Sequence, residues 1–179
     1  MAPSLSKGIR MNDDRKLFLV GGSESSGTRW LTSGLIAAGC CGDPGHDQAF
    51  DNAIGNHGNP WPTHWPAVAR RSYPHGDGWP DLSGIQQRIR DRFDAETIVV
   101  AIHRNFSDTI RSKVRNGNCS APEAEAETRF AFEELARQLG SFGGTVVEVR
   151  YERLRHESER RRLFDALGLP LPASFAFRG

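Results

Sequence analysis

The chain has 179 residues, which is enough for a single domain with a sizeable hydrophobic core. Its net charge of +1 argues against a broad nucleic-acid-binding surface, and no apolar run approaches the roughly 18 residues that a membrane-spanning helix needs. The three cysteines lack the spacing of a disulfide framework, and the polar segment 1–15 lacks the apolar core of a signal peptide. We therefore expect a cytoplasmic protein with a flexible arm over 1–15, a single domain over 16–179, and neither nucleic-acid nor membrane partners.

The first part of the domain has the pattern of a strand, a loop and a helix. An apolar run predicts a buried strand over residues 17–21, and a loop of small residues follows. Helical spacing then predicts a helix over 27–39 that ends at Gly39. Residues 40–80 form a long segment rich in Gly, Pro, His, Asn and Trp, with a short strand expected over 67–73.

The rest of the chain alternates between helical and strand patterns. The predicted helices span residues 81–93, 106–114, 122–139 and 155–167, and the predicted strands span 97–102 and 145–151. In the helix predicted over 122–139, Phe130, Leu135 and Leu139 are the expected core residues, and the glycines from Gly140 onward are expected to end it. The alternation predicts an α/β fold with three α/β/α layers and a mainly parallel central sheet, like that of P-loop NTPases.

The loop after the first predicted strand has the composition of an anion-binding site. Its small residues let backbone N–H groups close around a phosphate or a sulfate, and the following helix N-terminus adds positive partial charge. Gly22 and Gly27 have the spacing of a Walker A loop, but Thr28 stands where that motif has its lysine. Because kinases and ATPases use this lysine on the β- and γ-phosphates, its absence argues against nucleoside triphosphate chemistry.

A second signal follows the strand predicted over 97–102. Arg104 lies just after this strand, at the edge where open α/β sheets bind ligands. Ser112 comes eight residues later, two turns into the next predicted helix. An arginine and a hydroxyl in this arrangement can grip one phosphate together, and each charge-assisted hydrogen bond contributes about 1.5–3 kcal/mol.

Four segments resemble, in the same order, the motifs of sulfotransferases that use 3′-phosphoadenosine 5′-phosphosulfate (PAPS). Residues 25–30, Ser-Ser-Gly-Thr-Arg-Trp, resemble the 5′-phosphosulfate loop of that family, and residues 104–112 resemble its 3′-phosphate motif. Residues 149–154 resemble its Tyr-Glu-Asp-Leu segment, and residues 164–170 its Phe-Leu-Gly-Leu-Pro segment. The resemblance covers residues 17–170 and implies an enzyme that moves a sulfuryl group from PAPS to a hydroxyl or an amine, releasing 3′-phosphoadenosine 5′-phosphate (PAP).

The resemblance also implies which residues hold the nucleotide. The loop would hold the 5′-phosphosulfate, Arg104 and Ser112 the 3′-phosphate, and Trp30 the adenine ring, with Tyr151 nearby. The expected cofactor-binding residues are Ser23, Ser25, Ser26, Gly27, Thr28, Arg29, Trp30, Arg104, Ser112 and Tyr151. No metal ion is expected, because the adjacent cysteines at 40–41 lack the two-residue gap of common zinc sites.

The chain departs from the family at the lysine that precedes Ser-Gly-Thr and stabilises the leaving oxygen. Ser25 stands in its place. Because sulfuryl transfer builds negative charge on the leaving phosphate, another cation must meet that charge. Arg29 is the first candidate, and Arg70 or Arg71 is the second.

The base that takes the acceptor proton is a second departure, because the family's Lys-Thr-His-Leu-Pro segment is not reproduced. His75 is the first candidate, His64 and His57 follow, and Glu24 in the loop is a further option. Aromatic residues in the segment 40–80 suit a wall for the acceptor, which is expected to be a small molecule, a saccharide or a peptide. The chain is short for the family, which implies an open acceptor site or one completed by a partner subunit. The sequence does not set the oligomeric state.

Two alternative functions are consistent with the same fold. A small P-loop kinase is one, although the Walker lysine and a clear Mg²⁺-binding aspartate are missing. A non-catalytic sulfotransferase-like module that binds a nucleotide or a partner is the other, and Ser25 is its best support.

Overall fold

The computed structural model describes residues 15–42, 62–73, 81–117 and 119–177. Its centre is a four-stranded sheet in the order β2-β1-β3-β4, in which every neighbouring pair of strands is parallel. The strands are β1 (Lys16–Ser23), β2 (Ala67–Tyr73), β3 (Glu96–His103) and β4 (Thr145–Arg150). The helices are α1 (Thr28–Ala37), α3 (Leu82–Phe93), α4 (Phe106–Arg115), α5 (Ala121–Ser141) and α6 (Glu157–Leu167), and a 3-10 helix, η1 (Tyr151–Arg155), follows β4.

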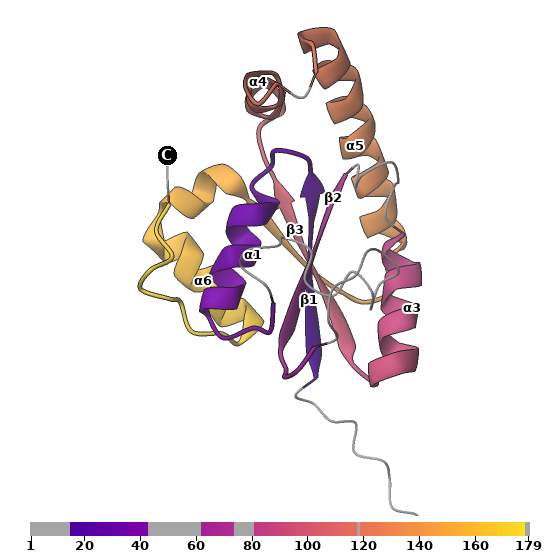
Figure 1. Cartoon of the computed structure of the whole chain (residues 1–179), viewed down its shortest axis with the longest axis vertical. Coiled ribbons are helices and arrows are strands. Elements are labelled where there is room, and N and C mark those ends of the chain that lie inside the picture. Colours follow the sequence, from indigo (N-terminus) through magenta and orange to yellow (C-terminus); the bar gives the residue numbers. More distant parts are fainter. Residues whose placement is uncertain (1–14, 43–61, 74–80, 118, 178–179) are drawn as a thin grey trace, which may run out of the picture.

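Helices cover both faces of the sheet (Figure 1). Helices α1 and α6 pack on one face, whereas α3 and α5 pack on the other. Alternate residues of β1 serve the two faces: Leu17 and Leu19 pack with α3 and α5, and Phe18 and Val20 pack with α1 and α6. This burial on both sides is typical of a strand in a parallel sheet. The predicted three-layer α/β/α fold is therefore confirmed, with a sheet that is parallel throughout the described strands.

The carboxyl ends of the strands meet at one edge of the sheet. Because all four strands are parallel, the loop between β1 and α1 lies at the same edge as the end of β3. Figure 1 shows α4 beyond the ends toward which the strands point. This edge therefore brings together the two segments that the sequence marked for binding a phosphate.

Helix α5 differs from the sequence-based expectation in two details. Phe130 is 50% exposed rather than buried, because it lies off the stripe that packs on the sheet. The buried residues of this helix are Ala124, Thr128, Ala131, Leu135 and Gln138. Gly140 does not end the helix, which continues to Ser141, where the serine hydroxyl donates to carbonyl groups of the last turn. No helix in the described ranges, α5 included, combines the length and apolarity that crossing a membrane requires.

Candidate functional site

The loop between β1 and α1 is a tight turn of small residues. The backbone N–H of Ser26 donates to the carbonyl of Ser23 at 3.0 Å, and the N–H of Glu24 donates to the carbonyl of Tyr73 at 3.0 Å. Ser25 and Gly27 both have positive φ angles, of 66° and 96°. The loop is thus held to the end of β2 while its backbone bends sharply into α1.

The N-terminus of α1 is open to a ligand. Gly27 occupies the N-cap position, and among the described residues no side chain caps the helix. The first turn also contains no acidic residue. The first N–H groups of a helix have no partner within the helix and carry partial positive charge, so this end attracts an anion.

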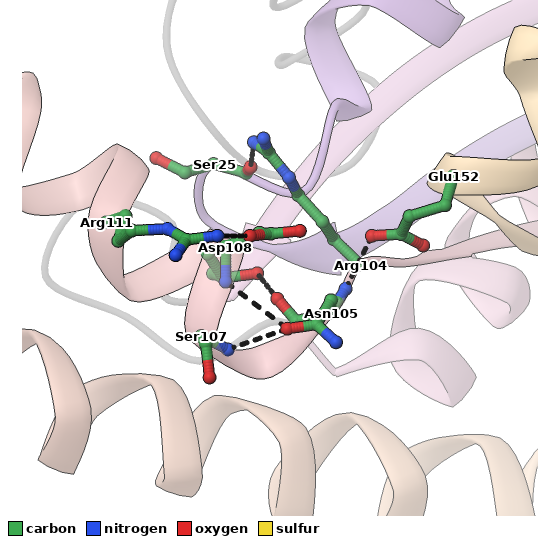
Figure 2. A network of polar contacts seen from close by, with 8 residues as sticks. Ser25, Arg104, Asn105, Ser107, Asp108, Arg111 and Glu152 are labelled. Atoms are coloured by element: carbon green, nitrogen blue, oxygen red, sulfur yellow. Dashed lines mark hydrogen bonds and ion pairs between the residues drawn. The ribbon is translucent and has the colours of Figure 1, made fainter.

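Arg104 reaches from the end of β3 to this loop. Its Nη1 donates to the carbonyl oxygen of Ser25 at 2.9 Å (Figure 2). The guanidinium carbon lies 4.8 Å from the centre of the Tyr151 ring, a cation–π distance. The Nε of Arg104 is buried and makes no hydrogen bond within the described part of the chain. Arg104 therefore spans the loop and the aromatic ring and keeps donor capacity for a ligand.

Asn105 fixes the backbone from which Arg104 extends. Its side chain caps α4 by accepting from the N–H of Ser107 at 3.0 Å, and its own N–H donates to Glu152 Oε1 at 2.7 Å. Figure 2 shows these contacts beside the ion pair between Asp108 and Arg111. The turn after β3 is thus tied both to α4 and to η1, which limits the positions open to Arg104.

One cavity of about 1010 Å³ joins the two predicted phosphate-binding segments. Ser25, Gly27, Thr28, Arg29 and Trp30 line it from the loop and α1, and Arg104 and Ser112 line it from β3 and α4. Ser112 is 7% exposed, and it lines this cavity as well as a neighbouring one. Seven of the ten expected cofactor-binding residues therefore line the same space.

The other three expected cofactor-binding residues lie next to the cavity. Ser23 and Ser26 are buried, and neither hydroxyl has a hydrogen-bond partner in the ranges that the structure describes. Tyr151 lines a smaller neighbouring cavity of about 130 Å³, which Arg104 also lines. The Tyr151 ring packs so closely on Gly27 that a Cβ there would lie 2.5 Å from it.

Trp30 is covered by a segment that the sequence analysis did not place in the site. Its ring stacks on Phe175 at 4.2 Å between centroids, and its Nε1 donates to the carbonyl of Ala176 at 3.3 Å. Ser174, Phe175 and Ala176 all line the cavity. This return across α1 has no periodic signal in the sequence, although two aromatic residues, at 175 and 177, follow the last predicted helix.

The candidate cations separate into two groups. Arg29 and Arg70 line the cavity, whereas Arg71 does not. Because side chains alternate along β2, Arg71 points to the other face of the sheet, where it is 2% exposed and donates to the carbonyl of Arg70.

Tyr73, two residues after Arg71, is also buried. Burial, followed by the nearby carboxylates of Glu134 and Asp81, raises the pKa of its phenol. The Tyr73 phenol is therefore neutral and cannot act as a base near neutral pH.

The histidine candidates are not brought to the cavity. His64 precedes β2 by three residues and therefore lies at the opposite edge of the sheet, where its Nδ1 is 3.3 Å from the hydroxyl of Thr63. This position is incompatible with its predicted role as the base. His75 and His57 lie outside the described residues. The described residues also contain no group of three or more His, Cys, Asp or Glu that could hold a metal ion.

Fold and site together define a parallel α/β protein with a cavity at the carboxyl edge of its sheet, lined by a loop of small residues and by arginines. No model of a known protein family matches the chain, and no curated protein matches it significantly. The function is therefore argued from the site itself.

Proposed function

We propose that the protein is a sulfotransferase that moves a sulfuryl group from PAPS to a hydroxyl or an amine of an acceptor. The observation that carries the proposal is the single cavity lined by the 25–28 loop, Arg104 and Ser112. These residues come from distant parts of the sequence: Arg104 and Ser25, which are in contact, are 79 positions apart. A ligand with anionic groups at two ends, such as PAPS, matches two separate anion-binding elements.

The residues of the cavity fit such a ligand. Arg104 lines the cavity, and its buried Nε has no hydrogen-bond partner in the described ranges. Buried polar atoms usually have a partner, so an anion is a natural one here. Gly22 permits the tight loop, since a Cβ at this position would lie 2.5 Å from Ser26 Oγ.

The roles of the residues follow from where they lie. The loop N–H groups and the N-terminus of α1 would hold the 5′ end, while Arg104 and Ser112 would bind the 3′-phosphate. PAPS supplies an activated sulfuryl group when it is bound. Arg29 and Arg70, which line the cavity, are the cations available for the charge that develops on the leaving phosphate. They take the role that the missing loop lysine has in the family.

We also propose that the protein acts in the cytoplasm. Cys40, Cys41 and Cys119 are all free thiols. Free thiols are typical of a reducing compartment.

The decisive experiment compares binding of PAP and ADP by calorimetry. PAP carries a 3′-phosphate that ADP lacks, so the wild type should bind PAP more tightly. Arg104→Ala should reduce PAP affinity about 10- to 150-fold, equivalent to about 1.5–3 kcal/mol for a charge-assisted bond, and should reduce ADP affinity much less. Arg161→Ala, which removes an exposed arginine of α6, is the control for charge alone.

The outcomes separate the three functions. If PAP has no advantage over ADP, the proposed function is wrong, and Mg²⁺-dependent ATP binding would then favour a kinase. If PAP binds tightly but no acceptor in a panel of phenols, sugars, amines and peptides is sulfated, the non-catalytic module is favoured. Equal losses for PAP and ADP in Arg104→Ala would mean that Arg104 only supports the loop.

A further inference from the structure

Lys113 is a buried lysine beside the cavity, and none of the roles described above uses it. Its side chain is fully buried in α4. The ammonium contacts two carboxylates, Glu127 Oε1 in α5 at 2.8 Å and Glu24 Oε2 in the loop at 3.7 Å. Burying an ammonium is costly unless carboxylates compensate it, so this cluster is a specific feature of the fold.

The two carboxylates differ in what else they face. Glu24 lines the cavity and is 43% exposed, whereas Glu127 does not line it. Glu24 is also the only acidic side chain among the described lining residues, which include Arg29, Arg70 and Arg104. A carboxylate at this position repels the phosphates of a donor. Its presence therefore requires an explanation other than donor binding.

The geometry leaves Glu24 able to accept a proton. Glu127 is at hydrogen-bonding distance from Lys113, whereas Glu24 lies beyond it, so the oxygens of Glu24 remain available to a ligand in the cavity. The N–H of Glu24 donates to the carbonyl of Tyr73, which fixes the backbone at this point.

We propose that Glu24 is the general base of the site and that Lys113 is the positioning residue that holds its side chain by ion pairing. This inference rests on the proposed sulfuryl transfer. As the acceptor oxygen or nitrogen forms its bond to sulfur, its proton passes to the Glu24 carboxylate. The bond between sulfur and the bridging phosphate oxygen breaks, and its electron pair leaves with PAP. The proton then passes from the half-exposed Glu24 to water.

The test uses Glu24→Gln and a matched control, Glu127→Gln. Each substitution removes one carboxylate charge from Lys113, but only the first removes it from the cavity. PAP release from PAPS is measured with water and with a panel of alcohols, phenols and amines, and PAP affinity by calorimetry. Glu24→Gln should lower the rate by at least about 100-fold, as expected for loss of a general base, and should not weaken PAP binding, because the carboxylate that repels the phosphates is gone. Glu127→Gln should keep both within threefold.

The separate effects on kcat and on PAP affinity test the role of Lys113. Lys113→Met removes the cation that faces Glu24, so kcat should fall while PAP affinity changes little. Lys113→Arg keeps a cation at this position and should preserve the rate. If Lys113→Met does not fold, Lys113→Arg and the glutamine variants still decide.

Each result has one meaning. A Glu24→Gln enzyme with an unchanged rate overturns the inference and leaves the proposed function intact. If both glutamine variants lose rate and PAP affinity in parallel, the two carboxylates and Lys113 only stabilise the structure. This result would also overturn the inference. Absence of any PAPS turnover by the wild type refutes both the inference and the enzymatic function.

Discussion

Gly27 is the position at which the loop becomes α1, and Gly27→Ala tests whether its geometry is required. Its φ is +96°, and an added Cβ would lie 2.5 Å and 2.6 Å from two carbons of the Tyr151 ring. Left-handed backbone costs an alanine about 1–2 kcal/mol, and overpacking against the ring adds about 1–3 kcal/mol. We therefore expect Gly27→Ala to lower the free energy of unfolding by about 2–5 kcal/mol.

Gly39→Ala is the matched control at the other end of α1. Gly39 also has a positive φ, of +103°, but an added Cβ would meet nothing within 4 Å. Only the backbone cost of about 1–2 kcal/mol remains. Urea unfolding of both variants measures the difference. In a Tyr151→Ala background, the cost of Gly27→Ala should fall to that of Gly39→Ala, which a double-mutant cycle would detect.

The same substitution should affect ligand binding. A displaced Tyr151 ring would disturb the Arg104 guanidinium that lies over it. Gly27→Ala should therefore weaken PAP binding in calorimetry, while Gly39→Ala should not. Equal destabilisation by the two alanines, with unchanged PAP affinity, would refute the argument that the ring and the loop are packed as a unit.

Two further predictions concern stability. Hydrogen bonds from Arg137, then from Gln138, lower the pKa of Glu134 from 4.5 to about 2. The ionised carboxylate therefore stabilises the fold above pH 4.5. This stabilisation is lost as the pH falls through about 2. Glu134→Gln should therefore be less stable than the wild type at neutral pH in thermal unfolding, with the deficit shrinking towards pH 2; a deficit that does not change with pH would contradict this. Phe164→Ala, at a fully buried site in α6, should cost about 3–5 kcal/mol in urea unfolding, whereas Phe130→Ala, at a half-exposed site, should cost less than about 0.5 kcal/mol; similar costs would contradict the packing described here.

The sequence predicted the fold best where burial requires apolar residues to recur at a regular spacing. The strand over 17–21 and the helix over 81–93 were predicted because a two-sided strand and a one-sided helix require regular apolar patterns, and Leu82, Ile85 and Ile89 are indeed buried. Phe130 was predicted to be a core residue because it is hydrophobic. The prediction was wrong because its position on the helix turns it away from the sheet. The stripe of α5 that packs is made largely of small residues, so its strongest apolar side chain lies elsewhere.

The cavity was predictable in part for a topological reason. Parallel strands place their carboxyl ends at one edge, so the convergence of the loop with Arg104 follows from the order of the elements. The choice between Arg70 and Arg71 did not follow, because both faces of β2 are covered and the sequence gives no polar face to orient it. The pairing of Lys113 with Glu24 and Glu127 depends on the packing of two helices and a loop, which no local pattern encodes.

The contact between Trp30 and Ala176 has a consequence for synthesis on the ribosome. The two residues are separated by 146 positions, and both line the cavity. A chain made from its N-terminus can form β1 and α1 early, but the wall over Trp30 is missing until nearly all of the described chain has left the exit tunnel. The cavity would thus be among the last parts of the molecule to form, and a truncated nascent chain would lack the wall over Trp30.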